Sequence, residues 1–372
     1  MKEIFKQFYL YIRKYFLYFL SIFLPHKKMA TGKSPDEIQK ALFIRIDRIG
    51  DLVLSTPALK AFRHFFPDCE LSVLASKSNH TVLLNLPYVD KIVTYDHGQN
   101  IFKKISTLRR LKKYKYDLVV DPYSGYELKT ALIAAYSGAP LRLGYASYGR
   151  EIFFNVIAGY PENDQHFKDV VINVFKPLGV EIAEATPEIN LSEAEKEWSI
   201  KWIEQHQVSS RHLVGIHPGA FYESQRWLKE SFAEIINRLQ ENNELEVILF
   251  GGPDDEELVK SIASLVYKTT NTYTFRSLRK FIALLSYCNI LVCNNSGPLH
   301  IATALNLPTV SFIGPTNSAR WSPIGEHHKI LKVEGLECLG CGQGKCPKGS
   351  MACMQGILPI EAFNAVNEML NS

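Results

Sequence analysis

The sequence lacks both of the glycine-rich phosphate-binding signatures that are easiest to recognise in an α/β protein. Its 22 glycines form neither a GxGxxG fingerprint nor a P-loop, which disfavours a dinucleotide-dependent oxidoreductase and a phosphate-loop kinase. A DxD-like acidic pair in a metal-binding loop is also missing, because Asp254-Asp255 begins a predicted helix and is suited to cap it. The net charge is only +4, so composition does not indicate a nucleic-acid-binding protein.

The chain has enough apolar material for two domains. It has 372 residues, of which 46% are hydrophobic and 22% are charged, and chains of this length usually divide into two hydrophobic cores. Its seven cysteines are an odd number in a long chain, which argues against a secreted disulfide scaffold. Cys69, Cys288 and Cys293 lie in apolar segments and are expected to be core thiols.

Residues 1–28 predict an amphipathic helix on a membrane surface. A helical wheel gathers the basic side chains in one arc, into which Leu10, Leu17 and Leu24 intrude, while Phe, Tyr and Ile fill the rest. A broad aromatic face beside a basic stripe is typical of a helix lying on an anionic leaflet. Residues 29–40 are expected to be a linker.

Three other interpretations of this segment stay open. A transmembrane helix is disfavoured because the uncharged run covers only residues 15–25. A signal peptide is disfavoured because Pro-His-Lys-Lys follows that run in place of a small-residue cleavage site. The remaining interpretation is a helix that packs on the folded domain.

The predicted N-terminal domain, residues 41–185, alternates strands and helices in the manner of a doubly wound sheet. A carboxylate, Asp51, follows the first strand, at the start of a predicted helix over 52–66. Such sheets carry function at the carboxyl ends of their strands, and Asp51 is placed to accept a proton as a general base. The alternative is that it only caps the helix. The other strands are predicted over 71–74, 91–94 and 117–120, with a basic helix over 103–115.

The predicted C-terminal domain, residues 186–335, has the same alternation. Strands are expected over 213–217, 246–250, 289–293 and 309–313. Helix N-termini in such turns bind phosphate through their backbone N–H groups, and Arg suits a phosphate clamp. These turns place Gly219, Arg226, Asn295, Ser296, Gly297 and His300 where a diphosphate could bind. The alternatives are that the turns are only structural, that His300 packs in the core and that Arg226 is solvated.

Residues 336–372 form a cysteine-rich segment followed by a predicted helix. Cys338, Cys341, Cys346 and Cys353 are spaced closely enough to hold a structural zinc ion or an iron–sulfur cluster. Disulfides or free thiols are the alternative.

Four segments in order resemble glycosyltransferase family 9, the heptosyltransferases of lipopolysaccharide core synthesis. They are Arg45–Pro57 with its RIDRIGD sequence, Pro218–Ala220 together with Arg226-Trp227, Phe250–Pro253, and Asn295–His300 with its continuation to Thr316. Each motif alone is modest, but the order and the spacing agree from about residue 41 to the end. Two positions depart from the family pattern: Asn295 stands where an Asp is usual, and Gln225 where a Lys is frequent.

This resemblance implies a fold and a reaction. The fold is α/β of the GT-B type, two doubly wound Rossmann-like domains facing a cleft, preceded here by the amphipathic helix. The reaction is inverting transfer of a sugar, with heptose expected, from a nucleotide-diphosphate donor, with ADP-heptose favoured, to a lipopolysaccharide-core or related lipid-linked glycan. No metal or other cofactor is required for this catalysis, and Asp51 matches the family's catalytic aspartate.

The residues themselves, together with this function, suggest partners and a location. Arg48, His166 and Lys168 are candidate contacts for an anionic acceptor, with solvated side chains as the alternative, and no nucleic acid is expected. The protein is expected to be cytoplasmic and peripheral on the inner face of the cytoplasmic membrane. The alternatives are a non-catalytic nucleotide-sugar-binding protein, a transferase that glycosylates a protein, and a sugar-nucleotide epimerase of the same fold.

Overall fold

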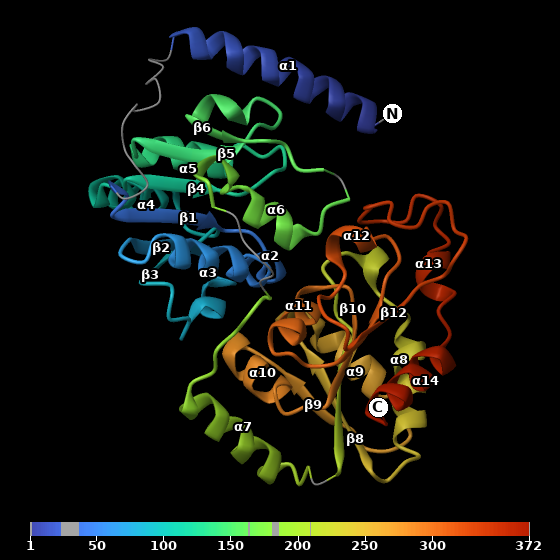
Figure 1. Ribbon diagram of the computed structural model, residues 1–372. Helices are drawn as coiled ribbons and strands as arrows, with labels where there is room; N and C mark the ends of the chain where they lie inside the picture. The colour runs from blue at the N-terminus through green and yellow to red at the C-terminus, as the bar shows by residue number, and fades with distance from the viewer. Residues whose placement is uncertain (1, 24–36, 163, 181–185, 209, 372) are drawn as a thin grey trace. The chain divides into compact units, whose positions relative to one another are not determined.

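The computed structural model describes residues 2–23, 37–162, 164–180, 186–208 and 210–371, and within the first helix it describes only the side chains of residues 8–19. The chain divides into two compact units, residues 1–185 and residues 186–372. Each unit is a six-stranded sheet flanked by helices (Figure 1). The predicted fold class, α/β with two doubly wound units, is therefore confirmed. Most of the linker predicted over 29–40 lies outside the described residues.

The sheet of the first unit is parallel throughout, in the order β3-β2-β1-β4-β5-β6. The chain moves outward from β1 to β3 and then returns to place β4 on the other side of β1. The strand order therefore reverses between β1 and β4. The strands are β1 (Lys40–Arg45), β2 (Glu70–Ser76), β3 (Lys91–Tyr95), β4 (Leu118–Asp121), β5 (Leu141–Tyr145) and β6 (Val156–Ala158).

Side chains of β1 alternate between the two faces of this sheet, as they must in a strand. Leu42 and Ile44 join the core cluster that includes α4 (Ile101–Tyr114) and α5 (Lys129–Ser137). Phe43 points to the opposite face, where its ring lies 6.1 Å from that of Phe175. That face carries α3 (Thr56–Phe65) and α6 (Phe167–Asn173), which pack on each other.

The helix predicted over 52–66 is two helices, and the prediction of a single one was wrong. The chain forms α2 (Ile49–Val53) and then α3. Ser55 and Thr56 bond back to the carbonyls of Asp51 and Val53, and Pro57 has no N–H to continue the ladder. Three 3₁₀ turns complete the unit: η2 (His80–Leu83), η3 (Arg150–Phe153) and η4 (Lys176–Leu178).

The N-terminal helix α1 (Lys2–Phe23) packs on the first unit beside η3. Its buried side chains are Leu10 and Leu17, two of the leucines within the basic arc. Arg13 of the same arc donates hydrogen bonds to the carbonyls of Tyr126 (2.7 Å) and Tyr148 (3.0 Å). The basic stripe was expected to face anionic lipid, and for Arg13 that expectation was wrong, because its guanidinium is turned toward the protein.

The outward face of α1 is aromatic. Eight residues on successive turns of α1 expose large apolar side chains, with exposed fractions between 39% and 62%: Phe8, Tyr9, Tyr11, Ile12, Tyr15, Phe16, Tyr18 and Phe19. Among the helices of the described chain, none is both long enough and apolar enough to span a bilayer.

The second unit repeats the plan, with the parallel order β12-β11-β10-β7-β8-β9. Here the strand order reverses between β7 and β10. The edge strands β9 and β12 were not expected from the sequence, and neither were β5 and β6 of the first unit. The strands are β7 (His212–His217), β8 (Leu245–Gly251), β9 (Asn271–Thr274), β10 (Ile290–Asn294), β11 (Thr309–Phe312) and β12 (His328–Leu331).

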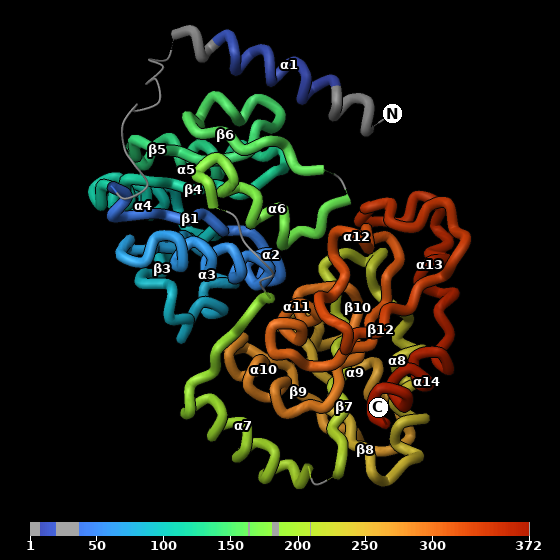
Figure 2. Tube along the Cα trace, in the orientation of Figure 1, coloured from blue at the N-terminus to red at the C-terminus, as the bar shows by residue number. Residues whose placement is uncertain are grey.

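Helices cover both faces of this second sheet. The C-terminal helix α14 (Pro359–Leu370) packs on α8 (Lys229–Leu239), and α7 (Glu193–Gln205) packs on α10 (Leu278–Leu285). Figure 2 follows the chain into α14, whose Ala362, Ala365 and Val366 enter the core of the unit. The other helices are α9 (Glu256–Ala263), α11 (Gly297–Ala304), α12 (Ser318–Trp321) and α13 (Ala352–Gln355), with the 3₁₀ turns η5 (Glu223–Gln225) and η6 (Pro253–Asp255).

Candidate active site

Both units place polar side chains at the point where the strand order of their sheet reverses. Open α/β sheets bind ligands at the carboxyl ends of their strands at such a switch point. In the first unit Asp47 and Asp51 follow β1, and Asp121 ends the neighbouring strand β4. In the second unit Gly219 follows β7, and Ser296 follows the neighbouring strand β10. The topology therefore gathers predicted site residues that are far apart in sequence.

Asp51, the predicted base, lies in the first turn of α2 and is partly buried. Its Oδ2 accepts the backbone N–H of Arg48 at 3.1 Å, so it does cap the helix, as the alternative interpretation held. Burial raises the pKa of Asp51, Arg45 and Arg48 act to lower it, and Asp47 adds to the increase. A carboxylate with a raised pKa is a stronger base, and capping does not use its second oxygen.

The loop before Asp51 is held by residues that sequence reasoning did not single out. The Asn79 amide donates to the carbonyls of Arg45 (3.3 Å), Asp47 (3.0 Å) and Arg48 (3.4 Å). Ser76 donates its hydroxyl to the Asp47 carbonyl at 3.4 Å. Asn79 is fully buried, so the loop is fixed from the end of the adjacent strand β2. The sequence Ser76-x-x-Asn79 after a strand matches no known motif, so the sequence alone gave no reason to select these two residues.

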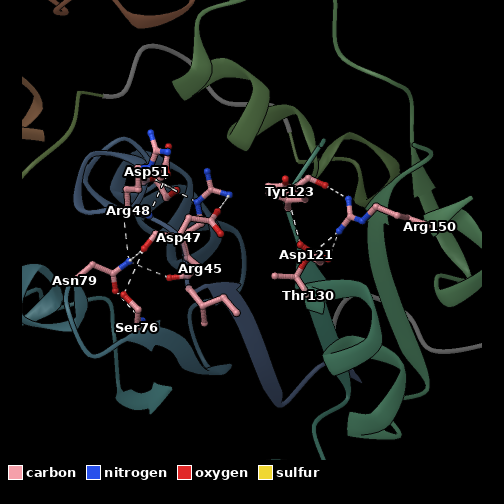
Figure 3. A network of polar contacts seen from close by, with 12 residues as sticks. Arg45, Asp47, Arg48, Asp51, Ser76, Asn79, Asp121, Tyr123, Thr130 and Arg150 are labelled. Atoms are coloured by element: carbon pink, nitrogen blue, oxygen red, sulfur yellow. Dashed lines mark hydrogen bonds and ion pairs between the residues drawn. The ribbon is translucent and has the colours of Figure 1, made fainter. Parts of the chain in front are cut away.

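Figure 3 shows two buried arginines near these carboxylates, Arg45 beside Asp47 and Arg150 beside Asp121. Arg45, the last residue of β1, has its Nη1 3.0 Å from Asp47 Oδ2. Arg150 Nη2 lies 2.5 Å from Asp121 Oδ2, and neither side chain is exposed to solvent. Removing one member of such a buried pair is costly, because the other charge stays buried without a partner. Neither arginine was among the predicted site residues.

The three predicted acceptor-side residues lie on the first unit. Arg48 is the N-cap residue of α2, directly before the turn that carries Asp51. His166 caps α6, where its Nδ1 accepts the N–H of Lys168 at 3.2 Å. The Nζ of Lys168 lies 3.4 Å from the Oδ1 of Asp169. Phe167, between His166 and Lys168, packs its ring 4.8 Å from the guanidinium carbon of Arg45. The structure thus brings the start of α6 beside the end of β1.

In the second unit, Gly219 and Ser296 meet across the switch point. The Ser296 hydroxyl donates to the Gly219 carbonyl at 3.3 Å, and Ser296 is the N-cap residue of α11, which begins at Gly297. A Cβ at Gly219 would lie 2.3 Å from the Asp255 carboxylate, so a larger residue there would require that carboxylate to move. At the start of α11, Pro298 has no N–H and the Leu299 N–H donates to the Ser296 carbonyl at 3.0 Å, so the Gly297 N–H is the first-turn donor that suits a diphosphate.

Arg226 lies at the end of η5, beside this turn. Its Nε donates to the Ala220 carbonyl at 2.9 Å, and its Nη2 lies 3.9 Å from Asp255, with 38% of the side chain exposed. Asp255 also accepts the Gly252 N–H, so its side chain caps the 3₁₀ turn η6 and makes no cap bond to α9, which it was expected to cap. Arg226 is therefore oriented by the protein and still reaches solvent, as an anion-binding residue must.

His217, at the end of β7, was missed by sequence reasoning. Its Nδ1 accepts the Gly219 N–H at 3.2 Å, which assigns the ring proton to Nε2. Burial lowers the pKa of His217, so the ring is neutral near pH 7. Its Nε2 is buried with no hydrogen-bond partner among the described residues.

The loop after β10 is anchored by two asparagines. The buried Asn294 donates to the Pro218 carbonyl at 2.7 Å and accepts the Trp227 N–H at 3.0 Å, which joins three loops. Asn295 donates its amide to the Trp321 carbonyl at 2.9 Å. An ionised Asp at this position could not donate this last bond. His300, within α11, is buried with its ring centre 6.1 Å from that of Trp321.

The four clustered cysteines, Cys338, Cys341, Cys346 and Cys353, are free thiols that line one cavity of about 30 Å³. Backbone N–H groups, that of Met351 foremost, lower the pKa of Cys346, and burial raises that of Cys353. Across the described ranges, no three His, Cys, Asp or Glu side chains lie close enough to share a metal ion. The expected core thiols Cys69, Cys288 and Cys293 are buried, which confirms that prediction.

Comparison with known proteins places these features in a family. The family model of glycosyltransferase family 9 (heptosyltransferase) matches residues 105–352. The chain is 25% identical to lipooligosaccharide heptosyltransferase 2 of Haemophilus influenzae over 344 residues, which cover 87% of this chain and 96% of the relative.

Two solved structures share the fold over 90% of this chain. One is a family 9 glycosyltransferase from Veillonella parvula, of which 98% is covered, with a TM-score of 0.78 and 22% identity. The other is the ADP-heptose lipopolysaccharide heptosyltransferase II of Escherichia coli, of which 99% is covered, with a TM-score of 0.75 and 22% identity.

Proposed function

The chain belongs to glycosyltransferase family 9, the heptosyltransferase family, and from this premise we propose that it transfers heptose from ADP-heptose to the core of a lipid-linked surface glycan. The observation that supports the proposal is that each candidate site lies at the switch point of its own sheet. Asp51 lies at the switch point of one sheet, and the Gly219–Ser296 turn lies at the switch point of the other. The ADP-heptose donor is suggested by the name of the E. coli structure, and a lipopolysaccharide or lipooligosaccharide acceptor by the names of both heptosyltransferases. The core is named by another relative, a lipopolysaccharide core heptosyltransferase of Haemophilus influenzae that is 23% identical over 305 residues.

In the proposed mechanism the first unit supplies the base. The free oxygen of Asp51 accepts the proton of the acceptor hydroxyl while that hydroxyl attacks the anomeric carbon. One displacement inverts the configuration at this carbon, so a single carboxylate suffices. The raised pKa of Asp51 strengthens it as a base.

The second unit is proposed to hold the donor and to stabilise the leaving ADP. The N-terminus of α11 and the half-exposed Arg226 face the growing negative charge of the diphosphate. The proton on His217 Nε2 is a further donor at this site. Asn295 contributes by fixing the loop, since its amide is bonded to Trp321.

A donor panel tests this function directly. Purified full-length protein is mixed with lipid extract and, one at a time, with ADP-heptose, ADP-glucose, UDP-glucose and GDP-mannose, and release of the nucleoside diphosphate is measured. We expect ADP release from ADP-heptose to be at least about tenfold faster than release from the others, equivalent to roughly 1.4 kcal/mol of discrimination. Binding of ADP-heptose without turnover on any acceptor would favour a nucleotide-sugar-binding protein instead.

We further propose that the protein associates with the membrane surface through α1. The support is the aromatic outward face, Phe8 to Phe19, on a helix whose other face is occupied by the protein. Tyr and Phe at this density suit the headgroup region of a bilayer, where amphipathic rings are favoured. A lipid-linked acceptor would be reached in that same layer.

A structural metal at the four cysteines is a separate proposal. Its support is that all four thiols line one cavity, and that backbone N–H groups favour the thiolate of Cys346. As they stand, no three of these thiols are close enough for one ion, so residues 338–353 must close around a metal for it to bind. The metal would have no part in the transfer step.

Metal analysis tests this second proposal. We expect about one zinc ion per chain or one iron–sulfur cluster, told apart by elemental analysis and visible absorbance. The double variant Cys338→Ser/Cys341→Ser should lose the metal and melt at a lower temperature. Metal-free protein with four rapidly titrating thiols would contradict the proposal.

A further inference from the structure

Arg45 is a charged residue in the interior of a sheet. It ends β1 on the face covered by α3 and α6, and only 1% of its surface is exposed. Its neighbours on the same face of the strand are apolar, Ala41 and Phe43. Burying a charge is expensive, and an apolar side chain of similar size at this position usually gives an equally stable fold. The cost calls for an explanation other than packing.

The contacts of Arg45 all lead to the Asp51 loop. Its Nη1 lies 3.0 Å from the Asp47 carboxylate, its Nε is 3.5 Å from the Asp51 carbonyl, and its guanidinium rests 4.8 Å from the Phe167 ring. Its Nη2 is buried with no hydrogen-bond partner among the described residues. Arg45 therefore holds two points of this loop and leaves one donor unsatisfied, which is a poor arrangement for stability alone.

Asp47 is fixed as firmly as Arg45. Its backbone carbonyl accepts hydrogen bonds from Asn79 and Ser76, and 23% of its side chain is exposed. A flexible surface carboxylate would be screened by water, but this one is confined beside the base. Asp51 thus has one carboxylate and one guanidinium as fixed neighbours, and these neighbours are paired with each other.

We propose that the Arg45–Asp47 ion pair is a positioning device for Asp51, which holds the carboxylate toward the acceptor hydroxyl and sets how readily it takes up the proton. This inference rests on the proposed role of Asp51 as the base. In this proposal Arg45 and Asp47 act through Asp51, so they are positioning residues. The charged groups that face Asp51 are Arg45 from β1 and Asp47 and Arg48 from the loop, while Asp121 at the end of β4 faces Asp47.

The two members of the pair act on Asp51 in opposite directions, which gives a sharp test. A base works only when deprotonated, so turnover falls as the pH drops through the pKa of Asp51. Asp47 raises that pKa, so in Asp47→Asn the acid limb of the kcat/KM profile should move to lower pH. Arg45 lowers it, so in Arg45→Met the limb should move to higher pH. Both variants should also lose about ten- to a hundredfold in plateau kcat, because Asp51 is less firmly held.

Two further variants guard against misfolding and against a merely structural role. Arg45→Lys keeps the charge, so its acid limb should stay near that of the natural protein. The double variant Arg45→Met/Asp47→Leu buries no lone charge and should fold; its limb should lie between those of the single variants. Melting curves are recorded for all four proteins.

The outcomes separate this inference from the proposed function. Acid limbs that coincide in all folded variants would overturn the positioning role, even if turnover were reduced. Shifts in the same direction for Asp47→Asn and Arg45→Met would overturn it as well. If Asp51→Asn keeps full turnover, the assignment of the base itself fails, whatever the pair does.

Discussion

Replacing Asp51 by Asn should lower turnover of ADP-heptose by about 10²–10⁴-fold and leave donor binding unchanged, because the proposed general-base assistance is lost while the proposed donor-binding residues all belong to the second unit. Asn is the right substitution. Its side-chain oxygen can still accept the Arg48 N–H that Asp51 Oδ2 now accepts at 3.1 Å, so the start of α2 is preserved. Single-turnover kinetics and calorimetric binding of ADP-heptose measure the two quantities separately.

Asp96 offers a matched control for this substitution. It too follows a strand of the first sheet, β3, and its carboxylate accepts a backbone N–H, that of Gly98, at 2.9 Å. It lies away from the switch point, so Asp96→Asn should change turnover by less than about twofold, within the range of ordinary surface substitutions. Equal losses in Asp96→Asn and Asp51→Asn would show that the change affects folding, and full activity in Asp51→Asn would remove it from the mechanism.

The second large effect is expected at the membrane. The variant in which Phe8, Ile12, Phe16 and Phe19 are all changed to Ser should bind phospholipid vesicles roughly a thousandfold more weakly than the natural protein. Each half-inserted side chain contributes about 1 kcal/mol, and four contribute about 4 kcal/mol. Leu10, which seats the helix, is left in place. Vesicle flotation over a range of lipid concentrations measures the partition coefficient.

Salt and a control variant distinguish this mode of binding from others. Because Arg13 is bonded to Tyr126 and Tyr148, binding should persist at about 1 M NaCl, where the Debye length is about 3 Å. The control changes four exposed apolar residues elsewhere on the first unit to Ser: Ile101, Phe102, Leu132 and Ile157. Loss of vesicle binding in salt, or an equal loss of binding in the control variant, would argue against membrane binding through the aromatic face of α1. Self-association that disappears in the α1 variant would point to a second copy of the chain as its partner.

The sequence predicted the sheets well because their signals are local. Apolar runs such as 41–46 and 246–250 lie within one residue or so of β1 and β8. The edge strand β12 was missed because its side chains are only partly buried, so it has no apolar run to recognise. The helix break at Ser55 depends on hydroxyl-to-carbonyl bonds that periodicity does not contain.

The site was predictable only where a motif marks it. Asp51 and the Asn295–His300 turn could be selected because of their resemblance to a family. Arg45, Asn79 and His217 act through contacts made by chain segments far apart, such as the bond from Asn79 to the Asp47 carbonyl. No local pattern encodes such contacts. The helical wheel separated the basic and aromatic sides of α1. Which of these sides contacts the protein depends on the carbonyls of Tyr126 and Tyr148, more than a hundred residues away.

The close packing of α1 on the first unit bears on how the enzyme would reach a lipid-linked acceptor. Gly149 has a φ of +87°, and a Cβ there would lie 3.1 Å from the Lys14 Cα, so the helix rests directly on backbone that only glycine provides. A helix held on a loose tether would let the enzyme tumble above the bilayer. In the proposed membrane-bound state, a helix packed firmly on the domain would confine the first unit to the lipid plane at one attitude, so the search for a lipid-linked acceptor would become two-dimensional and the local acceptor concentration would rise. A larger residue at position 149 should lengthen that search while leaving the proposed chemistry at Asp51 unchanged.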